Sequence, residues 1–172
     1  METVVSMTAT QTETPMESKQ RQIFQCTLSK DLQALQQLFE DWEDSEENQD
    51  RDQDQDQDQD RDQDWFGETD EAGRNALLIA SMAGSTAIVR ELITHGARVD
   101  VGTVRGYTAL HLAACWGHLQ TVRTLLELGA DPEARTFRGE RALDLARKYS
   151  RAGCAESLRR AQAQRAPPTP TD

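Results

Sequence analysis

Near the middle of the chain, apolar and polar positions follow a pattern that predicts two consecutive helices. The first is the short apolar segment LHLAA, which follows Thr108, a residue type that is favoured at helix starts. In the second, Val122, Leu125 and Leu126 have the i, i+3 and i+4 spacing of residues that share one helical face. Gly117 lies between the two segments and permits a sharp reversal of the chain. The pattern therefore predicts a helix–turn–helix unit.

This unit recurs along the chain at a constant period. Four columns of glycine, leucine or alanine occur three times at that one spacing: Gly73, Gly106 and Gly139; Leu77, Leu110 and Leu143; Ala80, Ala113 and Ala146; and Leu92, Leu125 and Leu158. Two pairs of glycines repeat in the same way, Gly84 with Gly117 and Gly96 with Gly129. Gly129 follows the second apolar stripe, where a left-handed residue often ends a helix, and Pro132 comes next as a helix breaker. Because one helix pair cannot cover its own apolar face, the units must stack on one another.

A degenerate copy of the unit precedes the three clear ones. When the middle unit is shifted back so that Leu110 falls on Ile23, its other apolar columns fall on Cys26, Leu35, Leu38 and Phe39. Residues 19–43 are therefore expected to form an N-terminal capping helix pair. The separation of Leu38 from Leu92 exceeds one period, and residues 44–64 account for the excess. Since insertions in repeat arrays normally map to loops, this segment is expected to be an insertion between two units.

The repeated units resemble those of a known family. TALHLAACWGHLQTVRTLLELGADP is similar to the ankyrin-repeat consensus, and RGERALDLARKYS resembles a terminal ankyrin repeat. The copy DEAGRNALLIASMAG is divergent, because Asn75 and Leu78 replace the usual threonine and histidine and with them local polar support. The resemblance covers about residues 19–161 and implies an all-α solenoid of stacked antiparallel helix pairs. Within residues 65–161, three repeats are expected at about 70–102, 103–135 and 136–161.

Charge is concentrated in one segment of the chain. The 172 residues carry a net charge of -11, and residues 41–64 alone hold thirteen Asp or Glu against two Arg. Aspartate at every second position would place like charges side by side in a strand and at i+4 in a helix, so residues 44–64 are expected to stay disordered and solvated. This run lacks the glycine and glutamate that a calcium-binding loop requires. The two ends, 1–18 and 162–172, are also expected to be disordered.

Composition excludes several classes of function. An acidic chain is a poor candidate for binding nucleic acid or an anionic membrane through bulk charge, and no apolar run is long enough to cross a bilayer. Cys26, Cys115 and Cys154 are too few and too far apart for a disulfide framework, so they are expected to be free thiols in a cytoplasmic or nuclear protein. The chain contains no nucleotide-binding loop, CxxC pair or HExxH motif, so neither enzyme activity nor a cofactor is expected.

Three zinc-ligating residue types lie close together in the middle unit. His111, Cys115 and His118 have spacings of four and three, which would place them on one face of a continuous helix. If the chain turns at Gly117, however, His118 begins the next helix and the common face is lost. The ankyrin resemblance implies a structural role for His111, in hydrogen bonds with Thr108 and the adjacent backbone. No metal site is therefore expected.

The resemblance also implies which residues contact a partner protein, namely those on the inter-repeat loops and the inner face of the short helices. The matching positions are Glu71, Arg74, Val104, Arg105, Tyr107, Cys115, Trp116, Phe137, Arg138, Glu140, Lys148 and Tyr149. Trp116 and Tyr107 are the leading candidates, because aromatic residues and arginine dominate binding energy at interfaces. Packing of Trp116 against a neighbouring helix is an equal alternative. For Phe137 and Tyr149 a structural role is favoured, covering the apolar edge of the last repeat.

These features together predict a non-catalytic, monomeric module or adaptor that binds another protein. Within the ankyrin family, the resemblance further implies a link to cell division. The alternative is an electrostatic decoy or chaperone, in which the acidic residues 44–64 capture basic proteins and the repeats only hold that segment. Residues 135–160 carry eight basic against three acidic residues, which suggests the further hypothesis that the acidic segment covers the last repeat and competes with an acidic partner.

Overall fold

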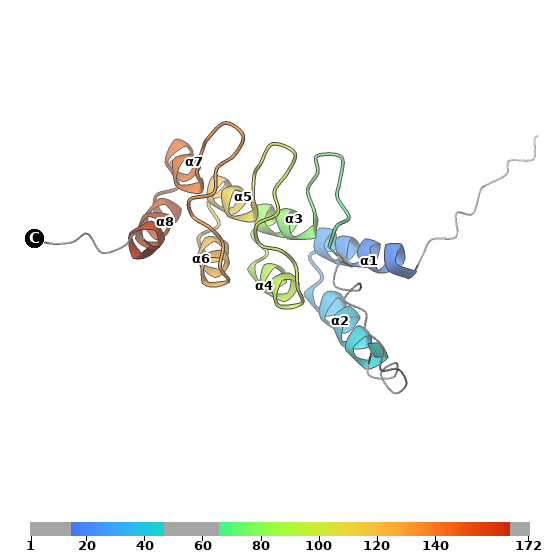
Figure 1. Cartoon of the computed structure of the whole chain (residues 1–172). Helices are drawn as coiled ribbons and strands as arrows, with labels where there is room; N and C mark the ends of the chain where they lie inside the picture. Colours follow the sequence, from blue (N-terminus) through green and yellow to red (C-terminus); the bar gives the residue numbers. More distant parts are fainter. Residues whose placement is uncertain (1–14, 47–65, 166–172) are drawn as a thin grey trace, which may run out of the picture.

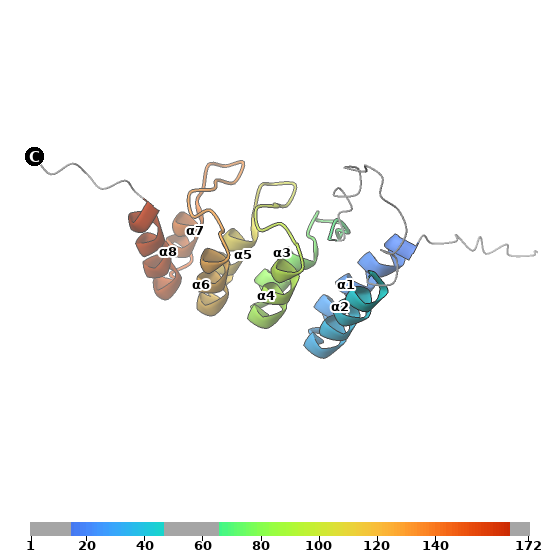
Figure 2. The ribbon, with the colours of Figure 1, turned by 60° about the horizontal axis from the view of Figure 1, so that its bottom comes forward.

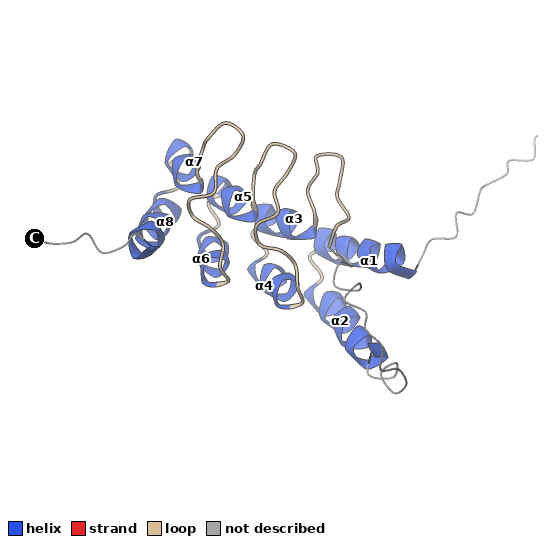
Figure 3. Cartoon of the chain, in the orientation of Figure 1, coloured by secondary structure: helices blue, strands red, loops and turns tan. Residues whose placement is uncertain are grey.

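The computed structural model describes residues 15–46 and 66–165, and this part of the chain is helical with connecting loops (Figure 3). Its helices are α1 (Pro15–Ser29), α2 (Leu32–Glu46), α3 (Ala76–Ala83), α4 (Thr86–Thr94), α5 (Ala109–Trp116), α6 (Leu119–Glu127), α7 (Ala142–Lys148) and α8 (Ala152–Arg165). Consecutive helices form antiparallel pairs, and the four pairs stand side by side in chain order (Figure 2). The predicted all-α solenoid of stacked helix pairs is therefore confirmed.

The helices form two layers, as Figure 1 shows. We call α1, α3, α5 and α7 the inner layer and α2, α4, α6 and α8 the outer layer. Long loops precede α3, α5 and α7 and project away from both layers (Figure 1). Each projecting loop leads directly into an inner helix, so the loops and the inner helices form one continuous surface.

Helix ends differ from the expected boundaries at both ends of the capping pair. Helix α1 begins at Pro15 rather than at residue 19, because proline fits the first helical turn, where its missing N–H is not needed. Helix α2 continues to Glu46 rather than 43, since no glycine or proline interrupts residues 44–46. The expectation of disorder is therefore wrong for residues 15–18 and 44–46. Residues 1–14 and 47–64 lie outside the described residues.

The last helix is also longer than expected. Helix α8 runs to Arg165, past the predicted end of the third repeat at residue 161. The segment 161–165, AQAQR, consists of strong helix formers, which carry the helix onward where the repeat pattern has ended. The predicted disorder is therefore wrong for 162–165, and residues 166–172 lie outside the described part.

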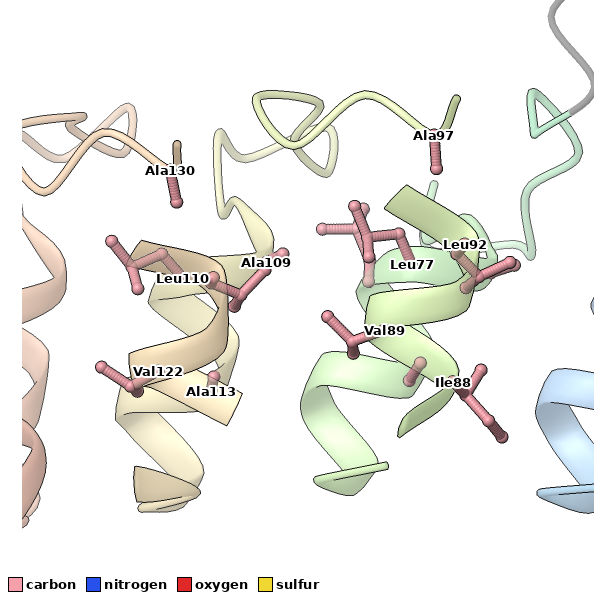
Figure 4. Packing of buried hydrophobic residues seen from close by; sticks show 14 of the residues in the cluster. Leu77, Ile88, Val89, Leu92, Ala97, Ala109, Leu110, Ala113, Val122 and Ala130 are labelled. Atoms are coloured by element: carbon pink, nitrogen blue, oxygen red, sulfur yellow. The ribbon is translucent and has the colours of Figure 1, made fainter. Parts of the chain in front are cut away.

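The core is a continuous row of side chains between the two layers. In the inner layer Leu77, Leu110 and Leu143 are buried at equivalent positions, and in the outer layer Leu92, Leu125 and Leu158 are buried in the same way. Figure 4 shows Ala97 and Ala130 pointing from the loops towards the helices beneath them. In the capping pair Ile23, Leu35 and Phe39 join this core, whereas Cys26 and Leu38 are only partly buried. Since a buried leucine side chain contributes roughly 1.5–3 kcal/mol, stacking of the repeats supplies most of the stability.

The turn between the two helices of each pair requires a left-handed residue. Gly84 and Gly117 have φ angles of 73° and 78° and end α3 and α5. The equivalent residues in the capping pair and in the last pair are Lys30 and Ser150, both with φ of 58°. All four pairs therefore reverse through the same backbone conformation, although only two have the residue that favours it.

The same turn is where one repeat contacts the next. His118 Nε2 donates to the carbonyl oxygen of Met82 at 2.9 Å, and Arg151, at the equivalent position of the following repeat, donates from Nε to the carbonyl oxygen of Cys115 at 3.2 Å. A Cβ atom on Gly84 would lie 2.5 Å from His118 Nδ1, too close for any real contact. Glycine at this turn is thus required both for its φ angle and for the space that the next repeat occupies.

Two glycines of the projecting loops allow the effect of the positive φ angle to be measured apart from the effect of crowding by the next repeat. Gly106 and Gly139 both have φ of 80°, but a Cβ on Gly106 would lie 3.0 Å from Phe137 Cδ1 and 3.1 Å from its backbone nitrogen, whereas a Cβ on Gly139 meets nothing within 4 Å. We predict that G139A lowers the free energy of unfolding by about 1–2 kcal/mol through backbone strain alone. G106A should cost about 1 kcal/mol more, because the next repeat must also shift. Urea denaturation followed by circular dichroism measures both, and equal losses would contradict the prediction.

Candidate interaction surface

Three equivalent hairpin loops, residues 70–74, 103–107 and 136–140, project from the inner layer. In each, the first N–H donates to the carbonyl of the fifth residue: Asp70 to Arg74 at 3.0 Å, Thr103 to Tyr107 at 2.9 Å and Thr136 to Glu140 at 2.9 Å. The side chain of the first residue accepts a return bond from the N–H of the fifth, for example Tyr107 N–H to Thr103 Oγ1 at 3.2 Å. These bonds hold the hairpins in one shape and present their tips in register.

Neighbouring hairpins are joined to one another as well. The N–H of Phe137 donates to the carbonyl oxygen of Arg105 at 3.1 Å, so the third hairpin is fixed against the second. In the first hairpin the Arg74 side chain is bound to Asp70, with Nη2 at 2.6 Å from Oδ2. Burial alone would raise the pKa of Asp70, but hydrogen bonds from the Arg74 side chain and from backbone N–H groups outweigh it and lower the pKa. The hairpin tips are therefore a fixed surface.

The residues predicted to bind a partner fall into two groups on this surface. At the hairpins, Glu71, Val104, Arg105, Phe137 and Arg138 are exposed, and Arg74, Tyr107 and Glu140 are half-buried. At the last turns of α5 and α7, Trp116, Lys148 and Tyr149 are exposed and Cys115 is half-buried. The structure thus places all twelve on the hairpins or inner helices and brings the members of each group side by side in successive repeats.

Large apolar side chains are exposed at matching positions of successive repeats. Val104 and Phe137 occupy the same position on two hairpins and are 70% and 80% exposed. Trp116 and Tyr149 occupy the same position at the ends of α5 and α7 and are 55% and 47% exposed. Leu28, which no sequence pattern marked as a binding residue, is exposed at the end of α1, at the position equivalent to Cys115. In the part of the chain that the structure describes, these five are the exposed large apolar residues, and all belong to the inner layer or its loops.

Phe137 is 80% exposed and lies beside Gly106 of the preceding repeat, away from the free edge of the last one. Tyr149 is 47% exposed at the end of α7, and its expected structural role stays a prediction. Part of the last repeat is more polar than the middle one, because Asp144 and Arg147 stand where the middle repeat has the buried His111 and Ala114. The N–H of Arg141 donates to the Asp144 carboxylate at 3.0 Å, and this bond lowers the pKa of Asp144. Trp116 is 55% exposed at the end of α5.

His111 and His118 serve the stack rather than a shared site. Helix α5 ends at Trp116, so the two imidazoles are not on one helix. His111 Nδ1 accepts from the Thr108 N–H at 3.1 Å, and its Nε2 donates to the carbonyl oxygen of Glu140 in the next repeat, also at 3.1 Å. His118 is engaged with Met82 as described above. Among the described residues, no group of three His, Cys, Asp or Glu side chains is arranged to hold a metal ion.

The divergent first repeat keeps its local support, contrary to expectation. Asn75 Oδ1 accepts a hydrogen bond from the N–H of Leu78 at 2.9 Å, which caps α3 as a threonine would. What Leu78 cannot provide is the bond that His111 makes to the following repeat. The substitution therefore removes a link between repeats and leaves the helix start intact.

Two titratable groups near α7 complete the surface. Cys115 is half-buried, and burial raises the pKa of its thiol, which favours the neutral thiol form. Glu140 Oε1 lies 3.4 Å from Lys148 Nζ, whereas its buried Oε2 has no hydrogen-bond partner among the described residues. The Glu140 carboxylate thus keeps one free acceptor beside Lys148.

On the opposite side of the molecule, a groove of about 430 Å³ lies between α6 and α8. Its lining includes Arg123, Arg160 and Arg165, but Arg160 is paired with Glu156 at 3.1 Å and Arg165 with Asp131 at 3.2 Å. The sequence pattern did not predict this groove, because its walls come from helices of two different repeats. None of the described helices is long and apolar enough to span a membrane.

A stacked array with this surface defines a helical repeat scaffold that presents loop tips and short helices to a partner. The sequence model of the family described as ankyrin repeats (3 copies) matches residues 23–136, so the chain belongs to the ankyrin-repeat family and is a protein–protein interaction module. It is also similar to the human protein Ankyrin repeat domain-containing protein 45, with 37% identity over 86 residues. Those residues are 50% of this chain and 28% of that protein, so the match spans less than a third of the relative's length.

Because His111 is buried, its contribution to the free energy of unfolding should depend on pH. Burial lowers the pKa of His111 below its ordinary 6.5, so as the pH falls through that value the unfolded chain takes up a proton that the folded chain does not. The contribution of His111 to stability is therefore complete above about pH 6.5 and is lost below it. We predict that the difference in unfolding free energy between the native chain and H111Q shrinks between about pH 7.5 and 5.5. His95 and His118 are present in both proteins and cancel; a difference that stays constant would contradict the prediction.

Proposed function

We propose that this chain is a non-catalytic adaptor that binds a partner protein across the hairpin tips and the last turns of the inner helices. The observation that carries the proposal is the register of the exposed apolar residues, Val104 with Phe137 and Trp116 with Tyr149. Scattered apolar residues on a surface are ordinary, but contiguous ones usually mark a binding site. Here they occupy the same two positions in the second and third repeats and do not belong to the buried core.

The rigidity of the surface supports the same function. The hairpins are closed by backbone hydrogen bonds, and the second and third are bonded to one another. A preformed surface loses little conformational entropy on binding, so more of the contact energy appears as affinity. We place this adaptor in the cytoplasm or nucleus, and division-associated structures are the first compartment to examine.

The alternative function, capture of basic proteins by residues 44–64, rests on the charge of a segment that lies almost entirely outside the described residues. The two functions assign partner binding to different parts of the chain. A deletion of residues 47–64 and a change of the exposed aromatic residues therefore separate them.

We predict that the double variant W116A/F137A loses the partners that proximity labelling identifies for the native chain in cells. Each aromatic truncation at an interface centre typically costs about 2 kcal/mol or more, so binding by the purified double variant should fall by roughly 100-fold or more. Both side chains are exposed, so the circular dichroism spectrum and the unfolding midpoint should be unchanged. Q120A, an exposed change on the outer helix α6, is the matched control.

A variant that lacks residues 47–64 tests the electrostatic alternative. Deletion of this segment should leave the labelled partners in place. If the deletion removes them while W116A/F137A retains them, the electrostatic alternative is correct and the interaction surface is not used.

A further inference from the structure

The exposed apolar residues are confined to part of the surface. At the positions of Val104 and Phe137 the first repeat has Glu71, and at the positions of Trp116 and Tyr149 it has Ala83. The first repeat therefore offers no large apolar contact at either of the two positions that are apolar in the second and third. The footprint of a partner that uses these contacts is centred on residues 103–151.

The charge of the surface also differs between the first repeat and the two that follow. Arg105 and Arg138 are exposed next to Val104 and Phe137, at the tips of the second and third hairpins, where the first hairpin has Ala72. Each of these two tips thus pairs an apolar side chain with a guanidinium group, and aromatic residues and arginine are the types that dominate binding energy at interfaces.

The basic character continues along the inner face of the last repeat. Lys148 stands beside Tyr149, with Nζ at 5.8 Å from the ring centroid, and it shares its charge with Glu140. Arg151 is exposed at the start of α8 and is held by its bond to the Cys115 carbonyl. In contrast, the hairpin of the first repeat carries Asp70, which is paired with Arg74, and the exposed Glu71. The exposed tip of the first hairpin is therefore acidic, whereas those of the second and third carry arginine.

Building on the proposed function, we propose that the partner is an acidic protein segment that carries apolar side chains and seats on the second and third repeats. Its carboxylates face Arg105, Arg138 and Arg151, and its apolar residues contact the Val104–Phe137 and Trp116–Tyr149 pairs. Neighbouring helices pack about 10 Å apart, so the apolar anchors are about three residues apart in an extended segment or about seven in a helix. Charge complementarity of this kind raises the association rate and selects against basic partners.

Nucleic acid is the competing occupant of a basic surface, and the structure favours protein. Each arginine at the hairpin tips has an exposed apolar neighbour, whereas a phosphate backbone gains from many basic groups and gains little from valine.

The proposal is tested by panning a random peptide display library against the full chain and measuring the affinities of enriched peptides by fluorescence anisotropy. Enriched peptides should have a net negative charge and paired apolar residues. The variant R105E/R138E should bind them at least about tenfold more weakly, and weakening with salt should be steeper for the native chain. R123E makes half of this charge change, at one exposed arginine on the outer helix α6 of the second repeat; it is the control and should change affinity by less than about twofold.

Every other result overturns the proposal in an identifiable way. Peptides that need Trp116 but are neutral or basic, or that ignore R105E/R138E, refute the acidic partner and leave the adaptor function intact. Acidic peptides that bind equally to W116A/F137A place binding elsewhere and refute both. If R123E weakens binding as much as R105E/R138E does, the attraction is general and does not depend on the hairpin tips. If a single-stranded RNA oligonucleotide binds in preference to the peptides, or if no peptide is enriched, an acidic protein segment is not the partner.

Discussion

The contact between one repeat and the next is the constraint on which the rest of this structure depends. A single helix pair leaves an apolar face that only a neighbour can cover, so no repeat is stable by itself. The closest approach occurs at the turn, where the backbone of one repeat admits a side chain from the following one, as Gly84 admits His118. Left-handed geometry and absence of a side chain are both needed there. The pair Gly84 and Gly117 in the sequence reflects this requirement.

The stack is not uniform, and the differences follow from single side chains. His111 joins the middle repeat to the last through the Glu140 carbonyl, but Leu78 makes no equivalent bond to the middle repeat. At the N-terminal end of the stack, α2 packs on α4 through Phe39, whose ring centroid lies 4.0 Å from that of the parallel His95 ring. The last two repeats, which carry the apolar and basic residues of the interaction surface, are joined in the inner layer by the His111 bond, whereas the first two are joined in the outer layer by the hydroxyl groups of Thr86 and Thr121 at 2.8 Å.

The constant period of the sequence was sufficient to predict the fold, because columns such as Leu77, Leu110 and Leu143 must be buried together for any stack to form. It could not predict helix ends, since the residues that extend α8 contact the preceding repeat through polar side chains that belong to no repeated column, as Arg165 does with Asp131. The sequence also could not show that Phe137 lies beside Gly106 of the preceding repeat, because that contact depends on how one hairpin is placed against the next.

The exposed side chains at the hairpin tips can differ from repeat to repeat without changing the fold. The residue types found there can therefore be set by binding. Glu71, Val104 and Phe137 occupy one hairpin position in three repeats, and their differing chemistry leaves the backbone hydrogen bonds of the hairpins the same. Folding therefore does not require valine or phenylalanine there, and an exposed aromatic ring adds a risk of aggregation. Val104 and Phe137 each lie against the glycine of the preceding hairpin, Gly73 and Gly106, yet most of each side chain remains exposed. The proposed contact with a partner gives this exposed apolar surface a function.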